Sequence, residues 1–317
     1  MAETGKNIDL AADLLLKGNL VAIPTETVYG LAANALNEKA VLSIFEAKQR
    51  PFFDPLIIHM PSIESIDKYA YLSDHRLQKL AKAFWPGPLT LLLPKKENIP
   101  NLVTSGLPSV AVRIPNHNLT LELLKKINVP LAAPSANPFG YVSPTQPAHA
   151  NSQLGDKIAY ILDGGACEVG LESTIVGVED DKVCIFRLGG LALEEIEKVV
   201  GKTELRINNS SNPTAPGQLK SHYAPKKTLF IGDIKELIKQ NMSNKIAILC
   251  FGEENFEGKD LIVFNLSKSK NLQEAAINLF KFLRLADESA ADVVLCEKVP
   301  DTGLGRAIND RLRRAAG

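Results

Sequence analysis

The chain contains 317 residues, of which 36 are Lys or Arg and 36 are Asp or Glu, so its formal net charge is zero. With 45% hydrophobic and 23% charged residues, it has the composition of a soluble globular protein with a real core. The balanced charge argues against a protein whose main work is to coat nucleic acid or an anionic membrane, and the apolar runs are far shorter than the ~20 residues of a membrane-spanning helix.

Residues 1–203 alternate between apolar residues at helical spacing and short apolar runs of strand length. The first helix is expected over residues 8–17 and ends at Gly18, a residue that commonly terminates helices. The mixture predicts an α/β domain. Further helices are expected at Glu38–Lys48, Asp74–Phe84, Leu119–Lys126 and Leu193–Val200, and strands at Leu20–Ile23, Pro55–Met60, Leu89–Leu93, Val110–Ile114, Val129–Ala133, Ala159–Leu162, Thr174–Val178 and Val183–Arg187.

The composition changes after residue 203. Residues 204–227 are polar and rich in Pro and Asn, which predicts a linker and not a core element. Residues 228–317 then predict a small parallel sheet covered by helices, so we expect two domains joined by this linker. The expected strands are Thr228–Ile231, Lys245–Phe251, Leu261–Phe264 and Val293–Cys296, and the expected helices are Asp233–Gln240, Asn271–Ala286 and Gly305–Ala315.

Cysteine and histidine are scattered along the chain. The four cysteines form no C-x-x-C pair, and the five histidines show no metal-binding spacing. These patterns predict packed thiols in a reducing compartment, without a disulfide framework or a dedicated transition-metal site. The N-terminal residues lack a basic segment followed by an apolar one, so we predict no secretory signal and a cytoplasmic protein.

Familiar phosphate-binding loops are not predicted. Residues 201–203 imitate the end of a P-loop without its first glycine, and residues 303–308 lack the third glycine of a dinucleotide fingerprint. A polar turn follows the first strand at residues 24–30 and could hold a small polar substrate. The alternative is a helix N-cap provided by Thr25 or Thr27, and from these residues alone the cap is favoured.

Lys48 and Arg50 follow a predicted helix and are two positions apart. An ammonium and a guanidinium at this spacing can share one anion such as a polyphosphate. The alternative is a solvated helix end, where cations favour the C-terminal dipole. We expect both residues on turns outside the core.

Arg113 follows alternating apolar residues on a predicted inner strand and therefore needs an anionic partner. A substrate carboxylate would serve, and so would an internal Asp. Ser135 and Asn137 lie among small residues that would let phosphate approach the backbone, although the same pattern fits a tight turn. His59 ends a predicted strand and alone would be interpreted as a structural histidine.

The order and spacing of these motifs resemble the threonylcarbamoyl-AMP synthase family in its long form. The matching segments are PTETVYGL from residue 24, AKQRP from 47, WPGPLTL from 85, AVRIP from 111, APSANPFG from 133, GLEST from 170 and HYAP from 222. The resemblance implies an α/β fold: a YrdC-like catalytic domain with a twisted mixed sheet, plus a smaller Rossmann-like C-terminal domain.

The resemblance also implies two adjoining ligand sites. Lys48 and Arg50 are the expected catalytic cations, and Arg113 is the expected partner of the threonine carboxylate. Asp54 stands where the family more often has Asn and adds a negative charge near phosphate. ATP would be held by Lys48, Arg50, Asp54, Ser109, Ser135, Asn137, Ser143 and Arg187, and L-threonine by Thr27, His59, Arg113, Ala133 and Ser173.

The implied reaction converts L-threonine, bicarbonate and ATP into threonylcarbamoyl-AMP and pyrophosphate, with Mg²⁺ bound to ATP. The product would pass to a downstream tRNA threonylcarbamoyl transferase, so we expect tRNA to be an indirect partner. We expect no membrane partner. His222 and Tyr223 in the linker are expected to act in a lid over the site. The alternatives are an RNA-binding module without turnover and a carbamoyl-adenylate-forming enzyme of different specificity.

Overall fold

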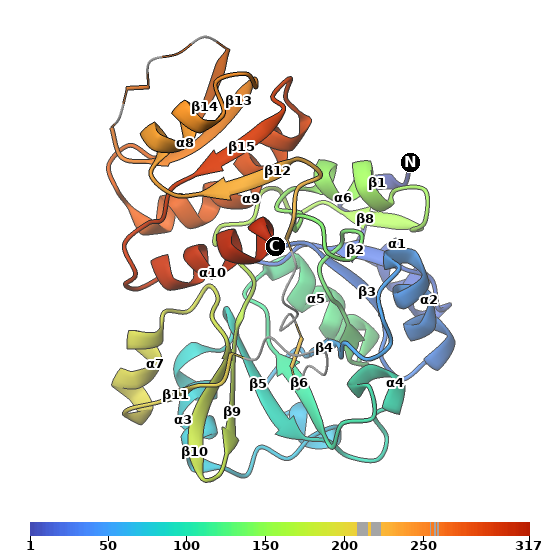
Figure 1. Cartoon of the computed structure of the whole chain (residues 1–317). Coiled ribbons are helices and arrows are strands. Elements are labelled where there is room, and N and C mark those ends of the chain that lie inside the picture. The colour runs from blue at the N-terminus through green and yellow to red at the C-terminus, as the bar shows by residue number, and fades with distance from the viewer. Residues whose placement is uncertain (208–214, 217–222, 254, 257, 259) are drawn as a thin grey trace.

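The computed structural model describes residues 1–207, 215–216, 223–253, 255–256, 258 and 260–317. Over these residues it contains an 11-stranded sheet and a separate 4-stranded sheet, each flanked by helices (Figure 1). Within the same residues, no helix combines the length and the apolar character needed to cross a membrane.

The larger sheet is built by the first part of the chain. Its strands are β1 (Glu3–Gly5), β2 (Val21–Ile23), β3 (Gly30–Asn34), β4 (Ile57–His59), β5 (Leu89–Pro94), β6 (Ser109–Arg113), β7 (Leu131–Ala132), β8 (Tyr160–Leu162), β9 (Thr174–Glu179), β10 (Lys182–Arg187) and β11 (Glu204–Leu205). Their order is β1-β8-β2-β3-β7-β4-β6-β5-β9-β10-β11. β4 and β6 are parallel whereas β5 and β6 are antiparallel, which confirms the mixed sheet.

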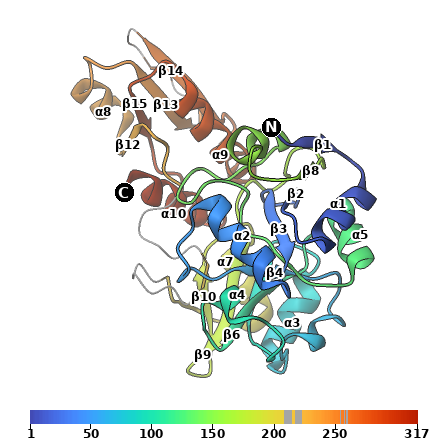
Figure 2. The same ribbon diagram turned by 90° about the vertical axis from the view of Figure 1, so that its right-hand side faces the viewer.

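Helices cover both faces of this sheet. They are α1 (Ile8–Leu16), α2 (Glu38–Lys48), α3 (His75–Phe84), α4 (Asn101–Thr104), α5 (Asn118–Ile127), α6 (Pro147–Leu154) and α7 (Leu193–Val200). α1 and α5 lie side by side and bury Leu15 and Leu124 in one cluster (Figure 2). Asn37 caps the start of α2 by accepting hydrogen bonds from two backbone N–H groups, and Asp74 does the same for α3, so local capping explains where these helices begin.

The smaller sheet has the order β12-β15-β13-β14, and all its strand pairs are parallel, as predicted. The helices α9 and α10 lie on the side of this sheet that faces the larger unit (Figure 1). Its elements are β12 (Thr228–Ile231), α8 (Ile234–Gln240), β13 (Ile246–Phe251), β14 (Leu261–Ser267), α9 (Leu272–Glu288), β15 (Val293–Cys296) and α10 (Gly305–Ala316).

The two units share a hydrophobic contact. One buried cluster contains Leu171 and Leu188 of the larger unit together with Phe280 of α9 and Leu312 of α10. Arg284 of α9 is buried and donates a hydrogen bond of 2.9 Å to the carbonyl of Val142. The helices of the second unit therefore pack directly on the loops of the first.

Several sequence-based expectations were wrong. The sequence did not predict β1, β3, α4 or α6. The residues after Thr25 and Thr27 lead into the strand β3, so the helix-cap alternative is wrong. The segment 204–227 is not merely a solvated linker: β11 pairs with β10, and the side chains of Ala215 and Tyr223 are buried.

Candidate active site

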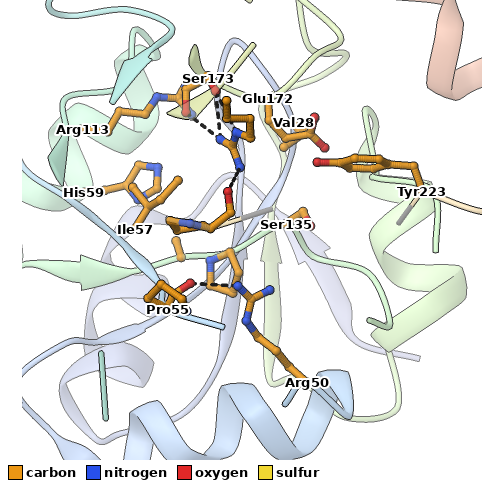
Figure 3. Close-up of a pocket in the computed structure, with 14 residues that line it drawn as sticks. Val28, Arg50, Pro55, Ile57, His59, Arg113, Ser135, Glu172, Ser173 and Tyr223 are labelled. Carbon is orange, nitrogen blue, oxygen red and sulfur yellow. Dashed lines mark hydrogen bonds between the residues drawn. The ribbon is translucent and has the colours of Figure 1, made fainter. Parts of the chain in front are cut away.

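A pocket lies where several strands of the larger sheet end (Figure 3). His59 and Arg113 are the last residues of the parallel strands β4 and β6 and are paired in register, so their side chains reach the same edge. Ligands in α/β proteins bind at this edge. The lining residues are Val28, Arg50, Pro55, Ile57, His59, Arg113, Ala133, Pro134, Ser135, Glu172, Ser173, Arg187, Pro216 and Tyr223.

Arg113 has a carboxylate partner within the chain, namely Glu26 and not an Asp. Its Nη2 lies 2.7 Å from Glu26 Oε2, and both side chains are 4% exposed. The two groups are at ion-pair distance but are not aligned for a hydrogen bond. Neither Glu26 oxygen, and not Arg113 Nη2 either, makes a hydrogen bond to any described residue. The Nε of Arg113 makes only a long hydrogen bond, 3.4 Å, to the carbonyl of Gly87. The guanidinium therefore keeps donors for a ligand.

His59 is neutral at physiological pH. Burial, followed by the positive charge of Arg113, lowers the pKa of its imidazole to about 3. Its Nδ1 has no hydrogen-bond partner among the described residues. The side chain therefore offers a polar contact in the pocket without adding a second positive charge beside Arg113.

Arg187 and Ser173 lie together in the pocket wall. Arg187 donates hydrogen bonds from Nε and Nη2 to the carbonyl of Ser173, at 3.0 and 2.9 Å, and a third to its hydroxyl at 3.1 Å. The Ser173 hydroxyl is also 2.7 Å from that of Thr90. Burial lowers the pKa of Arg187 to about 10, so the guanidinium stays charged at neutral pH. A charged donor in a fixed position suits an anionic ligand.

Lys48 and Arg50 are both buried, so the expectation that they lie outside the core was wrong. Lys48 ends α2, and Gln49 follows in the left-handed conformation with φ 53°, which turns the chain inward. Lys48 Nζ donates to the carbonyls of Ser135 and Asn137. Burial, and then the charge of Arg50, lowers the pKa of Lys48. Lys48 thus holds the loop at Ser135 in place without lining the pocket itself.

Arg50 lines the pocket and is anchored at its base. It donates to the carbonyls of Asp54 and Pro55 at 3.0 and 2.8 Å, and its Nη2 lies 2.9 Å from Asp54 Oδ2. The negative charge of Asp54 is therefore offset by Arg50. Burial lowers the pKa of Arg50, and the carboxylate of Asp54 opposes that effect.

Six of the sequence-predicted residues do not line the pocket. Thr27, Lys48, Asp54, Asn137 and Ser143 are buried near it, and Ser109 lies at the opposite end of β6 from Arg113. The pocket does bring together Arg50, His59, Arg113, Ala133, Ser135, Ser173, Arg187 and Tyr223. Of the two predicted lid residues, His222 lies outside the described residues, whereas Tyr223 is 1% exposed in the pocket wall.

Two acidic residues, Glu26 in the polar turn at 24–30 and Glu172, were not among the predicted site residues. Each lies inside a motif, T-E-T or L-E-S-T, and each is buried. Glu172 accepts hydrogen bonds from the hydroxyl of Ser143 at 2.6 Å and from Nε of Arg311 at 2.9 Å. A buried carboxylate needs such partners, but the sequence does not show where in the chain they are.

Arg311 brings the second unit to the site. It belongs to α10 and is fully buried. Besides Glu172, it donates to Asp310 Oδ2 at 2.7 Å and to the carbonyl of Leu188 at 2.8 Å, and its guanidinium carbon lies 4.8 Å from the ring centre of Tyr223. Burial would lower the pKa of Arg311, but Tyr223, Glu172 and Asp310 raise it, so the group stays charged.

The described residues contain no group of three or more His, Cys, Asp or Glu side chains arranged to hold a metal ion. The one carboxylate that lines the pocket, Glu172, already has Ser143 and Arg311 as partners. These side chains do not fit a resident metal, and an ion here would have to arrive bound to a ligand.

Comparison with known proteins covers both units. A family model described as "Telomere recombination" matches residues 13–189, and one described as "Threonylcarbamoyl-AMP synthase, C-terminal domain" matches residues 191–317. Threonylcarbamoyl-AMP synthase of Pyrococcus abyssi is 43% identical over 325 residues, covering 98% of this chain and 94% of its own. The Bacillus subtilis protein of that name is 39% identical, covering 97% and 92%. The crystal structure of P. abyssi Sua5 complexed with L-threonine matches with a TM-score of 0.93 at 41% identity, covering 100% of this chain and 98% of that one.

Proposed function

Because this chain belongs to the threonylcarbamoyl-AMP synthase family, we propose that its pocket converts L-threonine, bicarbonate and ATP into threonylcarbamoyl-AMP and pyrophosphate. The chain is an ATP-using enzyme of this family. The observation that carries the proposal is the polar edge of the sheet, where Arg113 keeps unused donors beside a neutral His59. A relative at 41% identity has been crystallised with L-threonine.

Threonine is proposed to bind at the ends of β4 and β6. Arg113 would pair with its carboxylate, because a guanidinium with unused donors is the natural partner of that group. His59 and Ser173 would contact its polar atoms, and the small Ala133 would leave room for it. Thr27 lies behind this wall, where its hydroxyl is 2.8 Å from that of Thr25, and would hold the loop in place.

ATP is proposed to bind on the side of the pocket formed by Arg50, Ser135 and Arg187. Lys48 and Asn137 hold the loop that presents Ser135, and Asp54 holds Arg50. Ser143 would act through Glu172. Ser109 remains a prediction, since it begins β6 at the strand end away from Arg113. Mg²⁺ would enter with ATP, held by phosphate and water.

The chemistry needs positioning more than a side-chain nucleophile. The neutral amine of threonine takes up the carbon of bicarbonate as an N-carboxylate, with loss of water. An oxygen of this carboxylate attacks the α-phosphorus, and the bond to the bridging oxygen breaks so that pyrophosphate leaves with the electron pair. Arg50 and Arg187, buried and charged, would stabilise the charge that develops on the phosphates, and the buried walls exclude water.

The alternatives lose support from the comparisons. Relatives that match nearly the whole chain are threonylcarbamoyl-AMP synthases, which disfavours both a carbamoyl-adenylate-forming enzyme and a passive RNA-binding module. Transfer of the product to tRNA by a downstream transferase, a cytoplasmic location and the lid role of Tyr223 remain proposals.

The test is pyrophosphate release from ATP and Mg²⁺ by the full chain. Release should require both L-threonine and bicarbonate, and serine or valine should not replace threonine. Equal release without an amino acid would refute the threonine assignment. Arg50→Ala should lower turnover by about 2–5 kcal/mol of transition-state free energy, the range for losing one partner of a desolvated charge pair. Because Arg50 is buried, a thermal melt must show that this variant folds.

A further inference from the structure

Arg311 of α10 is separated by 139 residues from Glu172, yet its guanidinium contacts the wall of the proposed nucleotide pocket. Two pocket-lining residues touch it: Glu172 accepts its Nε hydrogen bond, and the ring of Tyr223 lies 4.8 Å from its guanidinium carbon. Nη1 donates to Asp310 and Nη2 to the carbonyl of Leu188, so each of the three nitrogens of the side chain is held by an acceptor.

Glu172 creates an electrostatic difficulty for a nucleotide site. It is the one carboxylate among the pocket-lining residues, and it is 7% exposed. A negative charge in the wall would repel the phosphates of ATP, and little water is present to screen it. One Glu172 oxygen accepts from Ser143, which is neutral, so its direct ion-pair partner is Arg311, while Arg187 adds a positive charge at longer range.

Tyr223 depends on the same arginine. Its ring stacks on Phe280 of α9 with centroids 5.5 Å apart, and the Arg311 guanidinium lies over it. Both contacts come from helices of the second unit. Tyr223 has φ 67°, a left-handed conformation that is uncommon for a residue with a side chain and that needs tertiary contacts to hold it.

We propose that Arg311 is a positioning residue for nucleotide binding. It balances the charge of Glu172, fixes the carboxylate that orients Ser143, and holds Tyr223 in the pocket wall. This inference rests on the proposed function, because it requires a nucleotide in the pocket. It also gives the second unit a defined part in the reaction: the unit supplies the cation that pairs with the one carboxylate of a pocket otherwise lined by the cations Arg50, Arg113 and Arg187.

Arginine is required at this position by geometry as well as by charge. The planar guanidinium presents Nε to Glu172, Nη1 to Asp310 and Nη2 to Leu188 at the same time, while its face meets Tyr223. A lysine has a single ammonium at the end of a flexible stem and cannot satisfy these directions together.

The experiment measures ATP affinity by titration calorimetry on the full chain. Arg311→Met should weaken ATP binding by at least about tenfold, because it leaves Glu172 charged in the wall without its ion-pair partner. Adding Glu172→Gln to Arg311→Met should recover most of that loss, since the amide still accepts from Ser143 but carries no charge. If Arg311 acted only through packing, the double variant would bind ATP no better than Arg311→Met, and this result would overturn the proposal.

The matched control is Arg306→Ala. Arg306 also lies on α10 and makes an ion pair with Glu194 of α7, away from the pocket, so ATP affinity should stay within about twofold. Equal losses in Arg306→Ala and Arg311→Met would also overturn the proposal. If Arg311→Met does not fold, Arg311→Lys replaces it. Arg311→Lys should show an intermediate loss of ATP affinity, and an affinity equal to that of the wild type would count against the proposal. If the wild-type chain bound ATP but released no pyrophosphate in response to threonine, the proposed function would be refuted, whereas the role of Arg311 in ATP binding would not.

Discussion

Two buried arginine–glutamate pairs stand in the walls of one pocket, and they are built differently. Arg113 lies 2.7 Å from Glu26, but neither Glu26 oxygen makes a hydrogen bond to a described residue. Arg311 lies 2.9 Å from Glu172, and each of its three nitrogens donates to an acceptor. The first pair lies within the larger unit, where Arg113 ends β6 and Glu26 lies in the loop between β2 and β3, and the second joins the two units.

The difference separates a binding group from a supporting one. A guanidinium that keeps unused donors can exchange its internal partner for a ligand carboxylate, and it contributes less to stability than its burial suggests. A guanidinium whose three nitrogens all donate to aligned internal partners fixes the structure around it. Hydrogen-bond satisfaction, and not burial, is therefore what separates Arg113 from Arg311; Arg187 lines the pocket although its three nitrogens also donate to internal acceptors.

The largest expected effect is on stability. Arg311→Met should lower the free energy of unfolding by about 3–5 kcal/mol, because a buried carboxylate loses its cation. Arg113→Met, matched in size and burial, also deprives a buried carboxylate of its cation, but it should lower the free energy of unfolding less because it removes no short aligned hydrogen bond. Urea unfolding of both variants measures the difference. A larger loss in Arg113→Met would contradict the comparison.

The second effect is on threonine use. Arg113→Met should reduce kcat/KM for L-threonine by on the order of 3 kcal/mol, roughly a hundredfold, through the loss of the carboxylate partner. The ATP affinity of the same variant should change much less. Steady-state kinetics with each substrate varied in turn makes the measurement. If Arg113→Met weakened ATP binding and left kcat/KM for threonine unchanged, the assignment of the threonine and ATP sites would be wrong.

The third effect concerns pH. Since the pKa of His59 is lowered to about 3, the unfolded chain binds a proton at this residue between about pH 6.5 and 3 that the folded chain does not. Stability should be independent of this residue above pH 6.5 and fall by about 1.4 kcal/mol per pH unit below it.

The control for this pH effect is a second histidine. His149 also has a pKa lowered by burial, to about 4, so it contributes in the same direction from outside the pocket. His59→Gln should flatten the acid limb of the stability profile, and His149→Gln should flatten it by less. Identical profiles for wild type and His59→Gln would show that the imidazole is not held neutral.

The smallest effect is expected from Arg306→Ala. Its ion pair with Glu194 joins α10 to α7, but the two side chains are 27% and 41% exposed. Partly exposed pairs are screened by water, so the free energy of unfolding should change by no more than about 1 kcal/mol. Thermal melts at low and high salt would detect it. A loss near that of Arg311→Met would mean that any contact between the units, and not the Glu172 pair in particular, controls stability.

The sequence predicted the regular elements where local signals were complete. The helix at Glu38–Lys48 was found with the predicted bounds, since Asn37 caps its start and the chain turns at Gln49. The strand Gly30–Asn34 was missed because GLAAN holds no β-branched or aromatic residue. This segment is a strand because it pairs with β2 and β7, and the local sequence carries no information about that pairing.

The candidate site was predictable in its contents but not in its connections. The motifs supplied His59, Arg113, Ser135, Ser173 and Arg187, which the fold gathers around one pocket. The internal partners of the charged groups were not predictable, because Glu26 and Arg113, like Glu172 and Arg311, meet only through tertiary structure. For the same reason the burial of Lys48 and Arg50 could not be seen from their position after a helix.

The separation of Glu172 and Arg311 has a consequence for the order in which this molecule is made. Synthesis proceeds from the N-terminus at roughly 5–20 residues per second, so the carboxylate is present for many seconds before its arginine, 139 residues later, exists. During that interval the larger sheet can already form, but Glu172 in its pocket wall lacks its ion-pair partner. On the proposed role of Arg311, a nascent larger unit would bind nucleotide poorly until α10 has been added, which would delay ATP consumption until both units are complete.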